Sequence, residues 1–161
     1  MSQRENLLAK LHEEHQGFLE RLRGLTEDVA SGRPAPDQWS VVEQLLHLIE
    51  LERLWLGWAL QVRAAPGCQV GPVRPNPPAY PQAEGRILSD ALTELEETRR
   101  QTLAAIESMD EEDLQRKGKH LSFGEMSVLQ LLRALYRHDR MHAQQIAGEE
   151  VSFQPRFIRQ E

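Results

Sequence analysis

The chain of 161 residues is long enough for one domain, and its 40% hydrophobic content can fill a single core. Nineteen Lys and Arg residues stand against 25 Asp and Glu residues, and the resulting net charge of -6 argues against a nucleic-acid-binding protein. The single cysteine excludes an intramolecular disulfide, and no uncharged apolar run reaches the roughly 18 residues of a membrane span. We therefore expect one soluble, cytoplasmic domain over residues 1–161, with neither nucleic-acid nor membrane partners.

Apolar residues at spacings of three and four predict two helices in the first third of the chain. The first pattern covers residues 4–30. The second begins after Ser40, which forms a capping box with Glu43 and so supplies partners for the free amides of a helix start. We expect this second helix to run from about Val41 to about Val62.

Two further helices are predicted in the second half of the chain. The third pattern covers residues 85–108 and the fourth covers 128–147, where Ser127 is a candidate N-cap and Gly148 a candidate end. Four amphipathic helices without a recognisable strand pattern predict an all-α four-helix bundle.

The connections differ in character. Six of the nine prolines lie within residues 66–81, which predicts a long Pro-rich crossover loop between the second and third helices. So long a loop is unusual in a compact domain, and it indicates a binding site, a partner contact or a segment draped over the fold. The acidic segment 110–113 resembles the start of a helical turn but is expected to be a solvated connector. Segments 117–119 and 122–124 are predicted to be loops.

The C-terminal segment carries two phenylalanines, Phe153 and Phe157. Isolated exposure of such side chains is unfavourable, so we expect them to pack on the bundle or on a second subunit. Together with the Pro-rich loop they predict a homodimer.

His138 and His142 lie four residues apart in the predicted fourth helix. On an α-helix this spacing separates two side chains by about 40° around the axis and about 6 Å along it, so both imidazoles can reach one ion. The pair continues the apolar line of Leu131 and Leu135, which indicates that it projects into the bundle. A buried imidazole needs a polar partner, so the pair is either a hydrogen-bonded core feature or part of a metal site.

His47 is a third histidine predicted to face inward, because it shares its stripe with Leu51 and Leu54. If the second and fourth helices are neighbours, His47 can meet His138 and His142. Three neutral nitrogen donors suit zinc, nickel or another late first-row divalent ion, and they leave coordination positions open, as in catalytic sites. Such an ion lowers the pKa of a water or thiol that binds to it.

Two motifs around these histidines are similar to those of a known family. Residues 39–43 (WSVVE), followed by His47, resemble the entry into helix two of the DinB-like superfamily, which includes the YfiT-like proteins. The motif His138-x-x-x-His142-x-x-Gln145 resembles its closing motif. The resemblance covers nearly the whole chain.

The resemblance implies an up-down-down-up four-helix bundle, often dimeric, in which His47, His138 and His142 are the metal ligands. Some members of this family are transferases or isomerases that use a low-molecular-weight thiol as co-substrate, and many have no known reaction.

Two classes of function follow. The first is a metal-dependent enzyme that activates a small thiol or water toward a small-molecule substrate, as a thiol S-transferase or a hydrolase does. The second is a non-catalytic metal- or ligand-binding stress-response bundle. A ferritin-like di-iron protein would need Glu-x-x-His pairs, and neither Glu43 nor Glu50 begins one.

Other candidate residues have alternative interpretations. His15 is expected to be a core-edge histidine, with a fourth metal ligand or pocket wall as the alternative. His12 and His120 are expected at the surface or in loops. Cys68 is expected to be an inert thiol, because no neighbouring Lys or His lowers its pKa.

Three acidic residues near the histidines in sequence could orient an imidazole through its second nitrogen. Glu43 is predicted to cap a helix instead, and Asp139 points away from the inward stripe, while the role of Glu50 stays open. Three aromatic residues of these helices are expected in the core, with a pocket lining as the alternative: Trp55, Trp58 and Tyr136.

Overall fold

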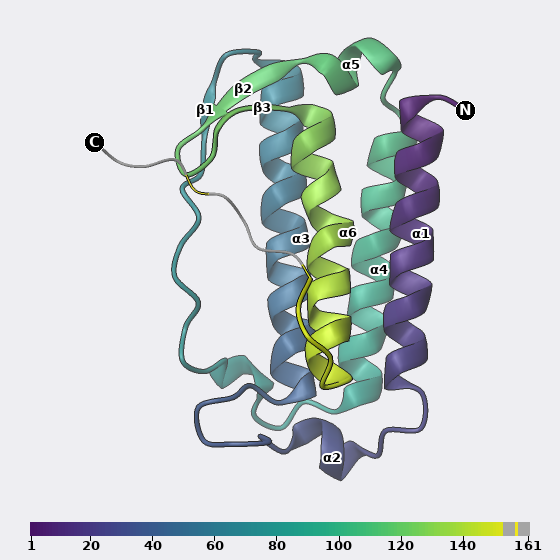
Figure 1. Ribbon diagram of the computed structural model, residues 1–161, viewed down its shortest axis with the longest axis vertical. Helices are drawn as coiled ribbons and strands as arrows, with labels where there is room; N and C mark the ends of the chain where they lie inside the picture. Colours follow the sequence, from purple (N-terminus) through teal and green to yellow (C-terminus); the bar gives the residue numbers. More distant parts are fainter. Residues whose placement is uncertain (153–156, 158–161) are drawn as a thin grey trace.

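The computed structural model describes residues 1–152 and residue 157. Its body is a bundle of four long helices, whose arrangement can be followed in Figure 1. They are α1 (Gln3–Leu22), α3 (Val41–Ala64), α4 (Leu88–Glu107) and α6 (Val128–Ile146). The four-helix bundle predicted from the sequence is confirmed.

The order of the helices in space differs from their order in the chain. α6 packs against both α1 and α3, and α3 also packs against α4. The segment after α3 returns along the whole length of that helix before α4 begins, so α3 and α4 run in the same direction (Figure 1). This long crossover is what brings the second and last long helices together.

Two predicted helix starts are confirmed, because each has a side-chain cap. The Ser40 hydroxyl accepts from the Glu43 amide at 3.1 Å, and the Glu43 carboxylate accepts in return from the Ser40 amide. Ser127 and Gln130 form the same reciprocal pair at the start of α6. Each pair satisfies amides that have no partner within the helix.

The single helix predicted over residues 4–30 is wrong. α1 ends at Leu22, and Gly24 adopts a positive φ of 83°, a conformation that favours glycine. The Thr26 hydroxyl then caps a separate short helix, α2 (Glu27–Ser31). The apolar spacing continued through this break, so periodicity alone did not show it.

The acidic segment 110–113, predicted to be a solvated connector, is exposed at its first three residues but is wrong as a connector, because it starts a helix and buries its last carboxylate. This segment begins a short helix, α5 (Glu111–Gln115), in which Asp110 and Asp113 cap each other's backbone amides. Asp113 is buried and forms an ion pair of 2.8 Å with Arg63 at the end of α3. The carboxylate therefore ties the connector to the bundle.

The prediction of no strands fails at the end of the bundle near α5. β1 (Gln69–Val70) lies within the Pro-rich segment and pairs in parallel with β2 (Lys117–His120), which pairs antiparallel with β3 (Gly124–Ser127). The strands are short and contain Gly and Lys, which weaken any strand pattern. Between β1 and α4, the Pro-rich segment also forms a 3₁₀ turn, η1 (Pro81–Ala83).

The sheet packs closely on α3. A Cβ atom at Gly118 would lie 2.5 Å from a methyl group of Val62, so only glycine fits there without a shift. His120, expected at the surface or in a loop, is instead fully buried. Its ring packs on Trp55 and Trp58, with ring centroids 5.4 and 4.9 Å away, and its Nδ1 accepts from the Ser122 amide.

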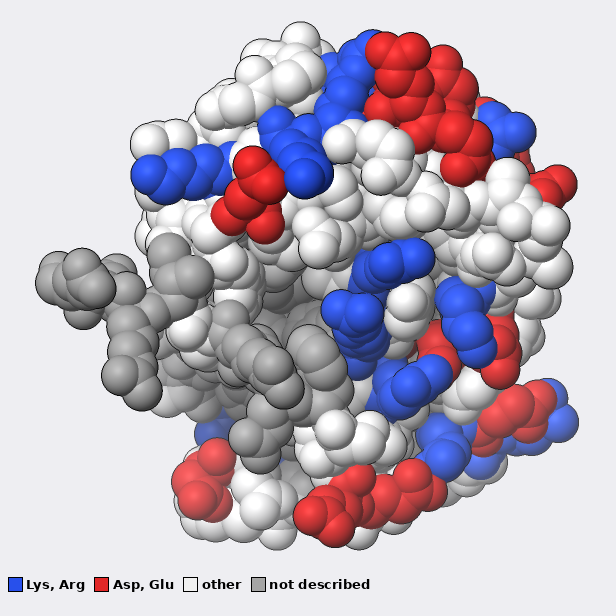
Figure 2. Space-filling view, turned by 45° about the horizontal axis from the view of Figure 1, so that its top comes forward, with Lys and Arg blue, Asp and Glu red and all other residues white. Residues whose placement is uncertain are grey.

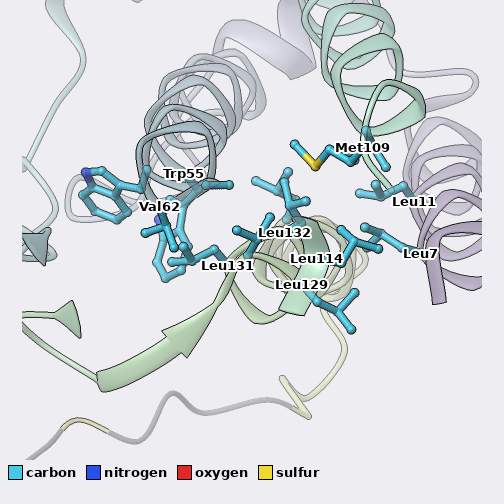
Figure 3. Packing of buried hydrophobic residues seen from close by; sticks show 14 of the residues in the cluster. Leu7, Leu11, Trp55, Val62, Met109, Leu114, Leu129, Leu131 and Leu132 are labelled. Atoms are coloured by element: carbon cyan, nitrogen blue, oxygen red, sulfur yellow. The ribbon is translucent and has the colours of Figure 1, made fainter. Parts of the chain in front are cut away.

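The core consists of two clusters of buried apolar side chains. One joins α1, α3, α5 and α6, and Figure 3 shows its side chains pointing toward one another from these elements. Trp55 and Trp58 belong to it and Tyr136 packs against it, which confirms the core assignment of these aromatics. Leu54, placed on the inward stripe by its spacing, is 41% exposed and lies outside both clusters.

A buried ionic network crosses the bundle between its helices. The Arg99 guanidinium of α4 donates to both Glu52 oxygens of α3 at 2.8 and 3.0 Å, and to Asp139 of α6 at 2.7 Å. It also donates to the Leu11 carbonyl of α1 at 3.0 Å. All three charged side chains are nearly inaccessible to solvent. Through these hydrogen bonds, one guanidinium connects all four long helices.

Charge on the outside is mixed. The face drawn in Figure 2 carries groups of acidic and of basic side chains. Exposed pairs such as Lys10 and Glu13 contribute little to stability because water screens them. Within residues 1–152, every helix is too short or too polar to span a membrane.

Of the two tail phenylalanines, Phe153 lies outside the described residues. Phe157 stacks on Phe123, with ring centroids 5.0 Å apart, and is 57% exposed.

The homodimer stays a prediction. Light scattering at micromolar concentration is expected to give twice the mass of one chain, and a monomeric mass would contradict it.

Replacing Arg99 by alanine is expected to lower the free energy of unfolding by about 3–5 kcal/mol, because two buried carboxylates lose the cation that they share. Urea unfolding at pH 7 measures this. The matched control is Arg100→Ala, which removes an exposed arginine from the same helix and should leave stability unchanged. Equal stabilities for the two variants would show that the network is dispensable.

Candidate metal centre

Three imidazoles meet between α3 and α6. His47 comes from α3, whereas His138 and His142 come from successive turns of α6. The Nε2 of His138 lies 3.1 Å from the Nε2 of His47 and 3.1 Å from that of His142. The potential ligand atoms all lie within 4.8 Å of one another, so the structure brings together the three histidines singled out in the sequence.

The ring of His142 is held by a side chain from the facing helix. Its Nδ1 lies 3.0 Å from Oε1 of Gln44, which stands one turn before His47 on α3. An amide oxygen only accepts hydrogen bonds, so Nδ1 carries the proton. The lone pair of His142 is then on Nε2, which faces the other imidazoles.

The ring of His47 is held from outside the bundle. Its Nδ1 lies 2.7 Å from the hydroxyl of Tyr80, in the segment that connects α3 to α4. The Trp39 ring packs against His47 and Tyr80, with centroids 4.8 and 5.1 Å away. His47 is therefore packed against two aromatic rings as well as against the imidazoles of α6.

The protonation state of the cluster follows from its burial. Loss of solvent lowers the pKa of His47 to about 4 and, with the charge of His47 added, that of His142 to about 3. Burial and the two neighbouring imidazoles hold the pKa of His138 well below its usual value. The three rings are thus neutral near pH 7.

Neutral imidazoles in this arrangement fit a metal ion. Nitrogen lone pairs about 3 Å apart repel one another unless a proton or a cation lies between them. Three neutral imidazole nitrogens form a donor set for late first-row divalent ions, and hydrogen bonds from the second ring nitrogen are typical of ligating histidines. The residues present therefore meet the requirements of a three-histidine metal site.

Access to the cluster is unequal. His47 and His142 are buried, each with 2% of its surface exposed, whereas His138 is half-buried. Three protein ligands leave coordination positions for other molecules. Among the described residues, His138 is therefore the ring of the cluster that is in contact with solvent.

The Pro-rich segment is fastened beside this cluster. Trp39 Nε1 donates to the Pro77 carbonyl at 3.2 Å, and the Tyr80 amide donates to the Glu43 carboxylate at 3.1 Å. Glu43 also receives two hydrogen bonds from Arg33. The sequence had indicated that the loop could belong to a binding site, but Tyr80 and Gln44 lay outside every motif that it presented.

The remaining candidates take other roles. Glu43 caps α3 and anchors the Pro-rich segment, and Asp139 binds Arg99, so neither is a hydrogen-bond partner of the three imidazoles. His15 is buried, and burial followed by the charge of Arg99 lowers its pKa to about 4. It lies outside the three-histidine cluster of the described residues. Cys68 is a free, half-buried thiol.

The chain is similar to known proteins in sequence and in fold. The chain is 28% identical over 142 residues to the uncharacterized protein YuaE of Bacillus subtilis strain 168, covering 78% of this chain and 85% of YuaE. YfiT from Bacillus subtilis, described as a probable metal-dependent hydrolase with an unusual four-helix bundle topology, has a similar structure. The TM-score is 0.74 at 13% identity, over 90% of this chain and 84% of YfiT.

A second solved structure, the four-helix bundle protein TT2238, matches with a TM-score of 0.64 at 18% identity, over 89% of this chain and 96% of that one. The family model of the DinB superfamily matches residues 10–146, a range that includes all three histidines of the cluster. The chain belongs to the DinB superfamily.

Proposed function

We propose that this protein is a metal-dependent enzyme in which His47, His138 and His142 hold a divalent ion, zinc or nickel, through their Nε2 atoms. The substrate is a small electrophile, and an ion held by these residues would supply Lewis-acid activation of a small thiol or water. The reaction is then thiol S-transfer or hydrolysis.

The observation that carries this proposal is the convergence of three neutral Nε2 atoms, two of them spaced 3.1 Å from the third. Two of the rings also have partners on Nδ1, which leaves Nε2 free to bind. The description of the structurally similar YfiT as a probable metal-dependent hydrolase supports the hydrolytic version. The thiol version is supported by the motifs around His47 and His138.

The residues of the chain determine what such an ion could do. A bound divalent ion acts as a Lewis acid and lowers the pKa of a coordinated water or thiol. The three imidazoles are neutral donors, so they leave the positive charge of the ion largely uncompensated. His138, as the half-buried ring, is where a small molecule from solvent would approach.

Protein purified without chelator is expected to contain close to one divalent ion per chain, and His142→Ala is expected to lower its metal affinity at least about tenfold. Elemental analysis and metal titration measure this. Wild-type protein loaded with metal should also turn over a small electrophile with water or with a panel of low-molecular-weight thiols. Chelator-treated protein should not.

The matched control is His12→Ala, which removes an exposed histidine from α1 and should change neither metal content nor turnover. Equal metal binding by the wild type and the His142 variant would exclude the site. Full occupancy without turnover in either assay would favour a non-catalytic metal-binding bundle.

Metal-free protein is expected to lose stability as the pH falls from about 7 to 5. In the folded state the pKa values of His47 and His142 are about 4 and about 3, below the unfolded value of about 6.5, so the unfolded chain binds more protons in this window. Each histidine should contribute roughly 1–2 kcal/mol to the loss. Urea unfolding of chelator-treated protein at several pH values measures it, and a flat profile would contradict the burial of neutral rings.

A further inference from the structure

The two buried ligands of the proposed site are supported by different parts of the chain. His142 is held by Gln44, on the helix that also carries His47. His47 is held by Tyr80, which lies 33 residues further along the chain in the Pro-rich connection between α3 and α4. One half of the site therefore depends on a segment outside the bundle.

The direction of the hydrogen bond between His47 and Tyr80 follows from proton counting. A neutral imidazole carries one proton, so an Nε2 lone pair available to a metal requires that Nδ1 be protonated. Nδ1–H then donates, and the Tyr80 oxygen accepts. The phenol proton must point elsewhere.

A neutral phenol has one proton to donate besides the lone pairs with which it accepts. Burial, followed by the negative charge of Glu50, raises the pKa of Tyr80. Glu50 stands about one turn after His47 on α3, on the exposed side of that helix. The phenol oxygen is therefore the acceptor that the structure places beside His47 Nδ1.

Tyr80 is held firmly enough to orient a ligand. Only 7% of its surface is exposed. Its backbone amide donates to Glu43 at 3.1 Å, and its ring meets Trp39 edge-on at 5.1 Å. Trp39 is itself bound to the Pro77 carbonyl of the same segment.

We infer that Tyr80 is a positioning residue, whose hydroxyl accepts from His47 Nδ1 and so keeps this ligand in the tautomer that binds metal. The inference rests on the proposed function, because it assigns a role toward the proposed ion. It also gives the Pro-rich segment a function, which is to position the Tyr80 hydroxyl beside His47.

Tyr80→Phe keeps the aromatic packing and removes the hydroxyl, and the chain offers a matched control in its other tyrosine, Tyr136→Phe. We expect Tyr80→Phe to weaken zinc and cobalt binding about 10- to 100-fold. The visible absorption of the cobalt complex should also shift, and nitrogen NMR of the metal-free protein should show His47 moving toward the Nε2–H tautomer. Tyr136→Phe should leave all three measurements unchanged.

The outcomes separate this inference from the proposed function. A wild type that binds no ion overturns both. If the wild type binds the ion and Tyr80→Phe binds it equally tightly, with the same cobalt spectrum, the role inferred for Tyr80 is wrong. The proposed metal site is then unaffected.

Thermal unfolding of the metal-free variants shows whether Tyr80→Phe still folds. If it does not, nitrogen NMR of the metal-free wild type decides, because it reports which ring nitrogen of His47 carries the proton. A proton on Nδ1, facing the Tyr80 oxygen, supports the inference, and a proton on Nε2 overturns it.

Discussion

One buried guanidinium sets the alignment of the bundle. Arg99 must keep Glu52, Asp139 and the Leu11 carbonyl within hydrogen-bond distance, because a buried charge without partners costs several kcal/mol. A slip of any long helix along its neighbours would break at least one of these contacts. Asp139 directly follows His138 in α6, and Glu52 lies in the same helix as His47. The alignment that satisfies Arg99 is therefore also the alignment in which the imidazoles of α3 and α6 can meet.

Much of this fold could be predicted from local patterns. The start of α3 at Val41 and that of α6 at Val128 were marked by capping residues, and the inward face of α6 by its spacing. The short strands could not be found in this way. β1 and β2 pair across about 50 residues of chain, each is only two to four residues long, and Gly118 is buried for its lack of a side chain rather than for its hydrophobicity. His120 was missed for the same reason, since the sheet that buries it was not predicted.

The candidate site was predicted in part. Two histidines at a spacing of four, with a third on another inward stripe, were enough to indicate the cluster. Their supporting residues gave no comparable signal. Gln44 is a common helical residue, and Tyr80 lies in a Pro-rich segment where no periodicity indicates which way a side chain points. Arg99 was likewise hidden, because a charged residue in an amphipathic helix is ordinarily at the surface.

The division of labour between bundle and connection has a consequence for how such a protein can change. The ion pairs and apolar clusters that stabilise the helices involve none of residues 74–79 of the Pro-rich segment, whereas Gly71 before them packs against His120. That stretch can vary in length and composition without loss of the helix bundle, provided that the Tyr80 hydroxyl still reaches His47 Nδ1. The orientation of His47 by Tyr80 is in this sense open to adjustment without any change to the ion pairs that align the helices.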